Sequence, residues 1–189
     1  GHVGPVMEFA GEHDALVIGP GLGDDPDTLD AVKAILESYS GTAVVDADAL
    51  SVVPDIETTA DLICTPHQGE LVDMGGQTSD DWRERRELIE EFAAELGHTL
   101  LVKGHYDIVS NGDRTRVSRT GNPGMTVGGT GDVLAGTTGA LAATQELHHA
   151  AALGAYVTGR AGDIVCRERG TGLLASDLFE AIPQAMGAE

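Results

Sequence analysis

Short apolar runs alternate along the chain with longer segments in which apolar residues recur every three or four positions. The short runs predict strands at residues 15–18, 43–45, 62–64 and 100–102. The periodic segments predict helices at residues 24–40, 80–96, 146–167 and 176–186, and one more from about residue 130. Asn111-Gly112 joins two further β-rich segments, residues 106–110 and 114–118, and predicts a β-hairpin after the fourth strand.

Strands that are apolar on both faces and are separated by helices predict a parallel sheet with helices on both sides. The hairpin would add antiparallel strands late in an otherwise parallel α/β sheet. We find no internal repeat, low-complexity tract or linker, so we expect residues 1–189 to form a single domain. Residues 1–11 predict no element of their own, as though the chain began partway through a fold.

The charge of the chain narrows the classes of partner. Asp and Glu number 31 against 11 Lys and Arg, the formal net charge is −20, and Lys33 and Lys103 are the only lysines. Such a surface repels nucleic acids and anionic membranes, so we expect neither as a partner. Dispersed carboxylates with few lysines are typical of salt-accumulating halophiles. We find no membrane-length apolar stretch and no leader-like start, and expect a soluble cytoplasmic protein.

A polar or glycine-rich loop follows each of the four predicted strands, in the order GPGLG, DAD, TPHQGE and KG. The carboxyl ends of parallel strands meet at one edge of a sheet, where ligands of open α/β folds bind. GPGLG alone is explained by a tight turn between a strand and a helix, and His67 alone is a weak signal. The four loops together predict one ligand-binding cleft.

Residues 121–143 contain seven glycines and a single charged residue, Asp132. Gly128-Gly129-Thr130-Gly131-Asp132 opens the predicted helix, and glycines there leave backbone N–H groups uncovered beside the positive end of the helix dipole. This arrangement favours the binding of a phosphate. Asp132 in the first turn is placed to accept a proton from a substrate hydroxyl as a general base. The alternative is that Asp132 only caps the helix and that the glycines only allow close packing.

The segments GPGLG, VVDADAL, TPHQGE, VKG and GNPGMTVGGTGDVLAG, in this order, resemble those of the NAD(P)H-hydrate dehydratases of the ribokinase-like superfamily, over residues 15–167. The resemblance implies a three-layer α/β fold and a repair enzyme that dehydrates the S-form of hydrated NADH or NADPH. ADP would be the co-substrate, with ATP as the alternative, and AMP and phosphate would be released. A kinase-like step on the ring hydroxyl would precede elimination of phosphate, with Mg²⁺ bridging phosphates through water and carboxylates.

The resemblance also implies roles for individual residues. Asp132 would be the catalytic base, and Gly21, Gly23 and His67 would contact the hydrated dinucleotide together with it. The adenine nucleotide would lie along Lys103, Gly104, His105, Tyr106 and Asp107, and its phosphate would meet Gly128, Gly129, Thr130 and Gly131. No residue is assigned as a metal ligand.

Two interpretations remain open for each of three further carboxylates. Asp46 and Asp48 either organise Mg²⁺ or the substrate loop, or cap the turn after the second strand. Glu70 either accepts the ring N–H of His67 or a Mg²⁺-bound water, or is a charge in the first turn of a helix. Arg83, Arg85 and Arg86, among acidic residues of the helix at 80–96, are expected to form i to i+4 ion pairs.

Relatives in this family carry an additional glycine-rich strand and helix at the N-terminus, so we expect an N-terminally incomplete domain. Many of them are fused to an epimerase domain, which implies a fused or separate epimerase as a partner. We also expect a homo-oligomer, with a tetramer as one form. Two alternatives stay open for the function: a ribokinase-like kinase of a thiamin precursor or a sugar, and a non-catalytic nucleotide-binding fragment.

Overall fold

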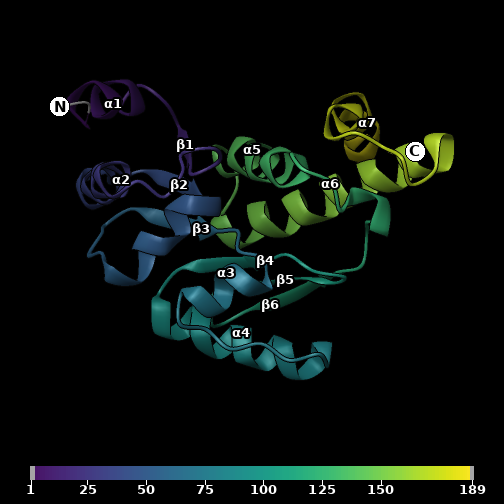
Figure 1. Cartoon of the computed structure of the whole chain (residues 1–189), viewed down its shortest axis with the longest axis horizontal. Helices are drawn as coiled ribbons and strands as arrows, with labels where there is room; N and C mark the ends of the chain where they lie inside the picture. The colour runs from purple at the N-terminus through teal and green to yellow at the C-terminus, as the bar shows by residue number, and fades with distance from the viewer. Residues whose placement is uncertain (1–2, 188–189) are drawn as a thin grey trace.

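The computed structural model describes residues 3–187 and is built around a six-stranded sheet in the order β1-β2-β3-β4-β5-β6 (Figure 1). Its strands are β1 (Ala15–Ile18), β2 (Thr42–Val45), β3 (Asp61–Cys64), β4 (Thr99–Val102), β5 (Asp107–Ser110) and β6 (Thr115–Ser118). The first four strands are parallel, and β5 and β6 form the antiparallel hairpin that follows them. The predicted mostly parallel α/β sheet with a late hairpin is therefore confirmed.

Helices cover both faces of this sheet (Figure 1). One side holds α2 (Pro26–Ser38), the 3₁₀ helix η1 (Ala47–Asp55), α3 (Gln68–Asp73) and α4 (Trp82–Leu96). The other side holds α5 (Thr130–Ala142), which packs on β1 and β2, and α6 (Leu147–Arg169), which packs on the strands from β3 to β6. Outside these layers, α7 (Leu178–Met186) packs on α6, and α1 (Val3–Ala10) packs on α2.

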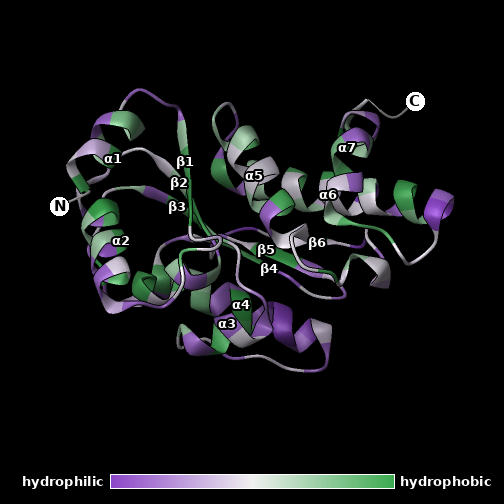
Figure 2. Cartoon of the chain, turned by 45° about the horizontal axis from the view of Figure 1, so that its top comes forward, coloured by the Kyte–Doolittle hydropathy of each residue, from purple (hydrophilic) through white to green (hydrophobic). Residues whose placement is uncertain are grey.

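The side chains of each central strand alternate between two apolar cores, as the period of a strand requires. In β4, Leu100 and Val102 belong to the core beneath α2, α3 and α4, whereas Leu101 belongs to the core beneath α5 and α6. Figure 2 shows mainly apolar residues in the central strands and a mixture of apolar and polar residues along the helices around them. Alanines on α6, among them Ala151 and Ala155, let this helix lie close to the sheet. Within residues 3–187, no helix has the length and apolarity needed to cross a bilayer.

The expectation that residues 1–11 form no element is wrong, because α1 is a two-turn helix. Gly4 and Pro5 at its start hid the helical pattern, yet Pro5 lies in the first turn, where no N–H is needed for an intrahelical bond. Met7 and Ala10 pack against the core under α2, whereas Phe9 is exposed. Tertiary contact with α2 thus stabilises a helix that the local sequence alone does not predict.

Candidate active site

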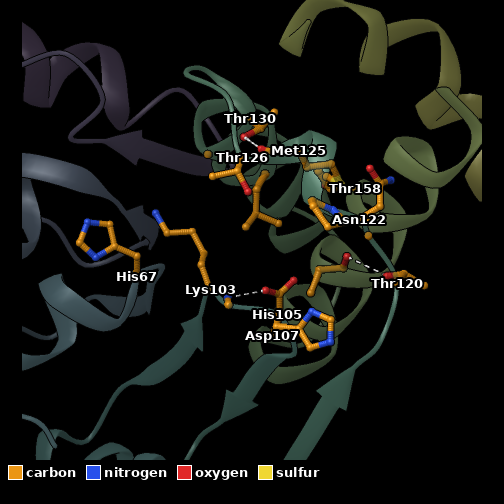
Figure 3. A pocket seen from close by; sticks show the side chains of 17 residues that line it. His67, Lys103, His105, Asp107, Thr120, Asn122, Met125, Thr126, Thr130 and Thr158 are labelled. Atoms are coloured by element: carbon orange, nitrogen blue, oxygen red, sulfur yellow. Dashed lines mark hydrogen bonds between the residues drawn. The ribbon is translucent and has the colours of Figure 1, made fainter. Parts of the chain in front are cut away.

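A cavity of about 460 Å³ lies at the carboxyl end of β4, between the loop at residues 103–107, the loop at residues 120–126 and the first turn of α5 (Figure 3). Residues of α6 form its inner wall, and His67 lies on the opposite side. A cavity is therefore present at the predicted edge of the sheet, but of the four loops expected to form it, TPHQGE and KG line it and GPGLG and DAD do not. Of the residues implied to bind nucleotide, it is lined by Lys103, Gly104, His105, Asp107, Thr130 and Gly131.

Lys103 is held at the cavity by two carboxylates, one from the residue after β2 and one from the first turn of α3. Its Nζ atom lies 2.8 Å from Oδ1 of Asp46 and 3.6 Å from Oε2 of Glu70. The same Asp46 oxygen accepts the Thr65 hydroxyl at 2.7 Å, and the Asp46 side chain is 3% exposed. Although Asp46 stands at the start of η1, its side chain makes no capping hydrogen bond. Asp46 therefore orients the ammonium of Lys103 and does not cap the turn after β2.

The start of α5 lies beside this ammonium. A Cβ atom placed on Gly131 would be 3.8 Å from Nζ of Lys103 and 3.9 Å from Oδ2 of Asp46. Gly129 precedes the helix with φ 93°, a left-handed conformation that favours glycine. Among the described residues, the backbone N–H groups of Gly131 and Asp132 meet no acceptor. Free N–H groups and a lysine ammonium that converge in this way can hold a phosphate.

Thr130 stabilises the loop that leads into α5. Its hydroxyl contacts the carbonyl oxygens of Met125 and Val127, at 2.8 and 2.9 Å. The hydroxyl is thus engaged within the protein, and Thr130 offers a ligand its backbone more than its side chain. Gly128, two residues earlier, is exposed, with open space where a side chain would be.

Asp132 lies in the first turn of α5 with an exposed side chain. Among the described residues, no side chain makes a capping hydrogen bond at the N-cap of α5, and Asp132 lies where a carboxylate interacts favourably with the helix dipole. Asp132 follows Gly131 but does not itself line the cavity. Its free carboxylate stands beside a helix start that, with its uncovered N–H groups, favours an anion.

The loops after β1 and β2 are joined to each other. The backbone N–H of Gly23 donates to Oδ2 of Asp48 at 2.8 Å, so Asp48 connects the GPGLG loop to the DAD loop. Gly19, with φ 128°, lies directly against the carbonyl of Asp46, where a side chain would collide with the backbone. Gly21 and Gly23 are exposed with open space around them, and neither lines the cavity. These two glycines therefore form a separate, open part of the same sheet edge.

His67 and Glu70 are joined by reciprocal hydrogen bonds at the start of α3. The backbone N–H of Glu70 donates to Nδ1 of His67 at 3.0 Å, and the backbone N–H of His67 donates to Oε2 of Glu70 at 2.6 Å. Because Nδ1 accepts a hydrogen bond, the neutral ring carries its proton on Nε2, which lies 3.6 Å from Oε1 of Glu70. Glu70 thus lies in the first turn of α3, as one interpretation has it. Its 3.6 Å separation from the His67 ring is too long for a hydrogen bond, and a contact with Mg²⁺-bound water stays a prediction.

Asp107, the first residue of β5, brings a half-buried carboxyl group to the cavity. Oδ1 of Asp107 accepts the backbone N–H of Gly104 at 3.0 Å. Burial raises the pKa of Asp107 to about 6, more than the Gly104 hydrogen bond and the nearby Lys103 lower it. The neighbouring Tyr106 does not line the cavity, and its ring packs edge-on against Trp82 at 5.6 Å between centroids. Tyr106 thus supports the loop from behind.

The expected ion pairs of the arginines on α4 are not found among the described residues. Arg85 is 6% exposed, and its guanidinium donates to the backbone oxygen of Ser79 at 3.0 Å and contacts Oε1 of Gln68 at 3.5 Å. A sequence pattern of alternating charges indicates ion pairs on a solvated face. It does not show that one arginine of the series turns inward.

Two polar residues of α6 that the sequence did not single out shape the cavity. The Asp163 carboxylate accepts the backbone N–H of Gly121 at 3.2 Å and the side-chain amide of Asn122 at 3.1 Å, which fixes the loop at the cavity wall. Thr158, one turn earlier, lines the cavity itself. Both lie within a helical pattern far from the glycine-rich segments. The feature of the sequence that could have identified them is the presence of polar residues on the buried side of that helix.

Within residues 3–187, no three His, Cys, Asp or Glu side chains gather in an arrangement that would hold a metal ion. Asp46 and Glu70 face Lys103, and Asp132 follows Gly131 in the first turn of α5. Mg²⁺ in nucleotide sites is commonly held by phosphates, water and one or two carboxylates. The side chains therefore fit a Mg²⁺ that arrives with a nucleotide better than one held in a protein cage.

Comparisons with known proteins agree with this arrangement. A family model described as NAD(P)H-hydrate dehydratase matches residues 3–184. The chain is 39% identical over 189 residues to the bifunctional NAD(P)H-hydrate repair enzyme Nnr of Pyrobaculum aerophilum, an overlap of 98% of this chain and 38% of that protein. The chain thus spans well under half the length of this curated relative.

Two solved structures have folds similar to that of this chain. The ADP/ATP-dependent NAD(P)H-hydrate dehydratase of Bacillus subtilis, co-crystallised with ATP and Mg²⁺ and soaked with CoA, has a TM-score of 0.81 at 29% identity, covering 92% of this chain and 66% of that one. A hydroxyethylthiazole kinase of Pyrococcus horikoshii has a TM-score of 0.78 at 21% identity, covering 100% of this chain and 78% of that one. The second similarity shows a shared fold alone. With its ribokinase-like sheet and helices, the chain belongs to the NAD(P)H-hydrate dehydratase family.

Proposed function

We propose that the protein catalyses the ADP-dependent dehydration of the S-form of NADH hydrate or NADPH hydrate, with release of AMP and phosphate. The observation that carries this proposal is the convergence of the Lys103 ammonium with the free N–H groups of Gly131 and Asp132 beside a cavity of nucleotide size. The names of the relatives and of the Bacillus subtilis structure supply the reaction.

Each residue then has a task in the transfer. The nucleotide occupies the cavity, and its terminal phosphoryl group lies against Gly131 and Lys103, where positive charge compensates the charge that develops during transfer. Asp132 accepts the proton of the ring hydroxyl of the hydrate, and the hydroxyl oxygen attacks the β-phosphorus of ADP, so that AMP leaves. Asp46 and Glu70 keep the lysine ammonium in place. Gly21, Gly23 and His67 contact the hydrated dinucleotide on the open side of the same edge.

The second step restores the dihydronicotinamide. The carbon–oxygen bond of the phosphorylated hydrate breaks, phosphate leaves, and the adjacent ring carbon loses a proton to form the double bond. Mg²⁺, bound through the nucleotide phosphates, would neutralise charge on the transferred group. Since the Bacillus subtilis enzyme is named ADP/ATP-dependent, ATP is the alternative co-substrate for this chain.

The experiment is an assay of hydrated NADH or NADPH with ADP or ATP and Mg²⁺. We expect the absorbance of the dihydronicotinamide to return in step with the release of phosphate. No return of absorbance with either nucleotide would contradict the proposed reaction. Accumulation of a stable phosphate ester would instead identify a kinase, and nucleotide binding without turnover would identify a binding fragment.

Further properties follow from the family resemblance and from composition. We propose that residues 1–189 act as one domain, that it forms a homo-oligomer such as a tetramer, and that an epimerase, fused or separate, supplies the S-form. The bifunctional names of its relatives support the epimerase partner. The substrates favour a cytoplasmic location, and the net charge of −20 favours a salt-rich cell interior.

A further inference from the structure

One hydroxyl in the wall of the cavity has no partner. Thr158 on α6 is 2% exposed, and among the described residues its Oγ1 atom makes no hydrogen bond. Thr158 borders the cavity in Figure 3, and its helix neighbours Ala155 and Gly159 also line it. A buried hydroxyl without a hydrogen bond costs free energy, so a hydroxyl left free at a cavity wall indicates a ligand that completes it.

A second threonine, Thr138, also has a buried hydroxyl without a partner among the described residues, but this hydroxyl does not face the cavity. Thr138 on α5 is also buried, and its Oγ1 atom likewise has no partner among residues 3–187. Its hydroxyl is pressed against Gly154 of α6, and Thr138 does not line the cavity. The hydroxyl of Thr138 is sealed between two helices, whereas Thr158 borders an open space.

The walls around Thr158 indicate which part of a nucleotide it meets. The phosphate-binding position lies at Lys103 and Gly131, on the side of the cavity that also carries His67 (Figure 3). Small or apolar residues line the cavity as well, among them Leu134 of α5 and the α6 neighbours of Thr158, Ala155 and Gly159. A nucleotide with its phosphates at the cationic end places its flat base against this apolar wall.

Other polar side chains on this side are already engaged. The Asn122 amide donates to Asp163 at 3.1 Å, and its oxygen accepts the backbone N–H of Gly124 at 3.1 Å. The Thr120 hydroxyl donates to the backbone oxygen of Tyr156 at 3.1 Å. Thr158 therefore offers a buried neutral hydroxyl that is free to contact a base. The Asp107 carboxyl, which also lines the cavity, already accepts the Gly104 N–H through Oδ1.

We propose that the Thr158 hydroxyl hydrogen-bonds the edge of the purine base and so determines specificity for an adenine nucleotide. The proposal rests on the proposed function in one respect, that a nucleotide occupies this cavity. A buried hydrogen bond between protein and ligand contributes modestly to the binding free energy. This contribution is lost when a methyl group of the same shape replaces the hydroxyl.

The experiment compares Thr158→Val with the matched control Thr138→Val in the full chain. Calorimetry would measure the affinities for ADP, 2′-deoxy-ADP and pyrophosphate, and thermal unfolding would check the fold. We expect Thr158→Val to weaken binding of both nucleotides by the same factor, about three- to tenfold, and to leave pyrophosphate binding unchanged. Thr138→Val should bind all three as the wild type does. Thr158→Ser, which keeps the hydroxyl, should restore most of the nucleotide affinity.

The possible results separate this proposal from the proposed function. Equal ADP affinity in Thr158→Val and Thr138→Val would overturn the role of Thr158 while leaving the nucleotide site intact. An equal loss for ADP and pyrophosphate would also overturn it, because the effect would then not involve the base. A loss for ADP that is absent for 2′-deoxy-ADP would place the contact on the ribose and overturn the assignment to the base. If the wild-type chain binds neither ADP nor ATP, the proposed function itself fails.

Discussion

At the scale of single residues, Asp132 combines an exposed carboxylate with a helix start that favours anions. We expect Asp132→Asn to bind ADP at least as tightly as the wild type, because it removes a negative charge beside the phosphates. Turnover of hydrated NADH should fall by a factor of about 10² or more, because the base is lost. The two quantities are measured by calorimetry and by the absorbance assay. Turnover close to that of the wild type would show that another group takes the proton.

Gly131 leaves open the space that a phosphoryl group would occupy between the helix start and Lys103. We expect Gly131→Val to fold but to bind ADP weakly, since its branched side chain covers the free N–H groups. The lost stabilisation of the transition state should be about 3–4 kcal/mol, the typical effect of losing such a donor. Gly136→Ala, at an exposed position of the same helix with open space around it, is the control. ADP affinity equal in the two variants would argue against a phosphate at Gly131.

Asp107 makes stability depend on pH in a defined direction. Its pKa is raised from 3.8 to about 6 on folding, so between these values the folded state binds more protons than the unfolded state. Above about pH 6, Asp107 is charged in the folded state, and the full free-energy cost of burying this charge lowers the stability of the fold. This free-energy cost decreases as the pH falls and is absent below 3.8, where Asp107 is protonated in both states. Asp107→Asn, which can still accept the Gly104 N–H, should raise Tm at pH 8. The Tm difference from the wild type should shrink toward pH 4, and a difference independent of pH would exclude this explanation.

At the scale of elements, the cavity depends on how closely α6 approaches the loop at residues 120–125. A Cβ atom on Gly159 would lie 2.7 Å from the backbone carbon of Thr120, too close for the loop to stay in place. We expect Gly159→Ala to displace this loop and to weaken ADP binding about tenfold or more, since overpacking of this kind costs about 1–3 kcal/mol. Gly172→Ala, where nothing lies near the added atom, is the matched control. Wild-type affinity in Gly159→Ala would show that the loop yields without cost.

At the scale of the whole molecule, carboxylates far outnumber the cations that could pair with them. The ion pairs of lysine and arginine within residues 3–187 involve Lys33, Lys103, Arg114 and Arg169. With a net charge of −20, the remaining repulsion destabilises the compact state in dilute buffer. We expect Tm to rise steeply between dilute buffer and molar KCl, because salt at that concentration shortens the screening length to about 3 Å. A Tm that does not change with KCl would contradict this.

The sequence by itself determined the order and the type of most elements. The strands begin and end within about a residue of their predicted positions, and α5 starts at Thr130 as expected. These features are visible in the sequence because apolar periodicity and turn residues act over a few neighbouring positions. The same holds for the polar loops at the carboxyl ends of the strands and for the glycine-rich helix start. The loops that meet at the ligand-binding edge of such a sheet were therefore predictable, and the binding of a ligand there stays a prediction.

Only the tertiary structure decided which of these residues meet. Lys103 and Asp46 are 57 positions apart, and their contact depends on the pairing of β2, β3 and β4. Thr158 borders the cavity, and Arg85 is buried, because of how α6 and α4 pack. Tyr106 turns away from the cavity because Trp82 offers it an aromatic contact. Such contacts join distant segments through register and packing, and no local pattern in a single sequence records them.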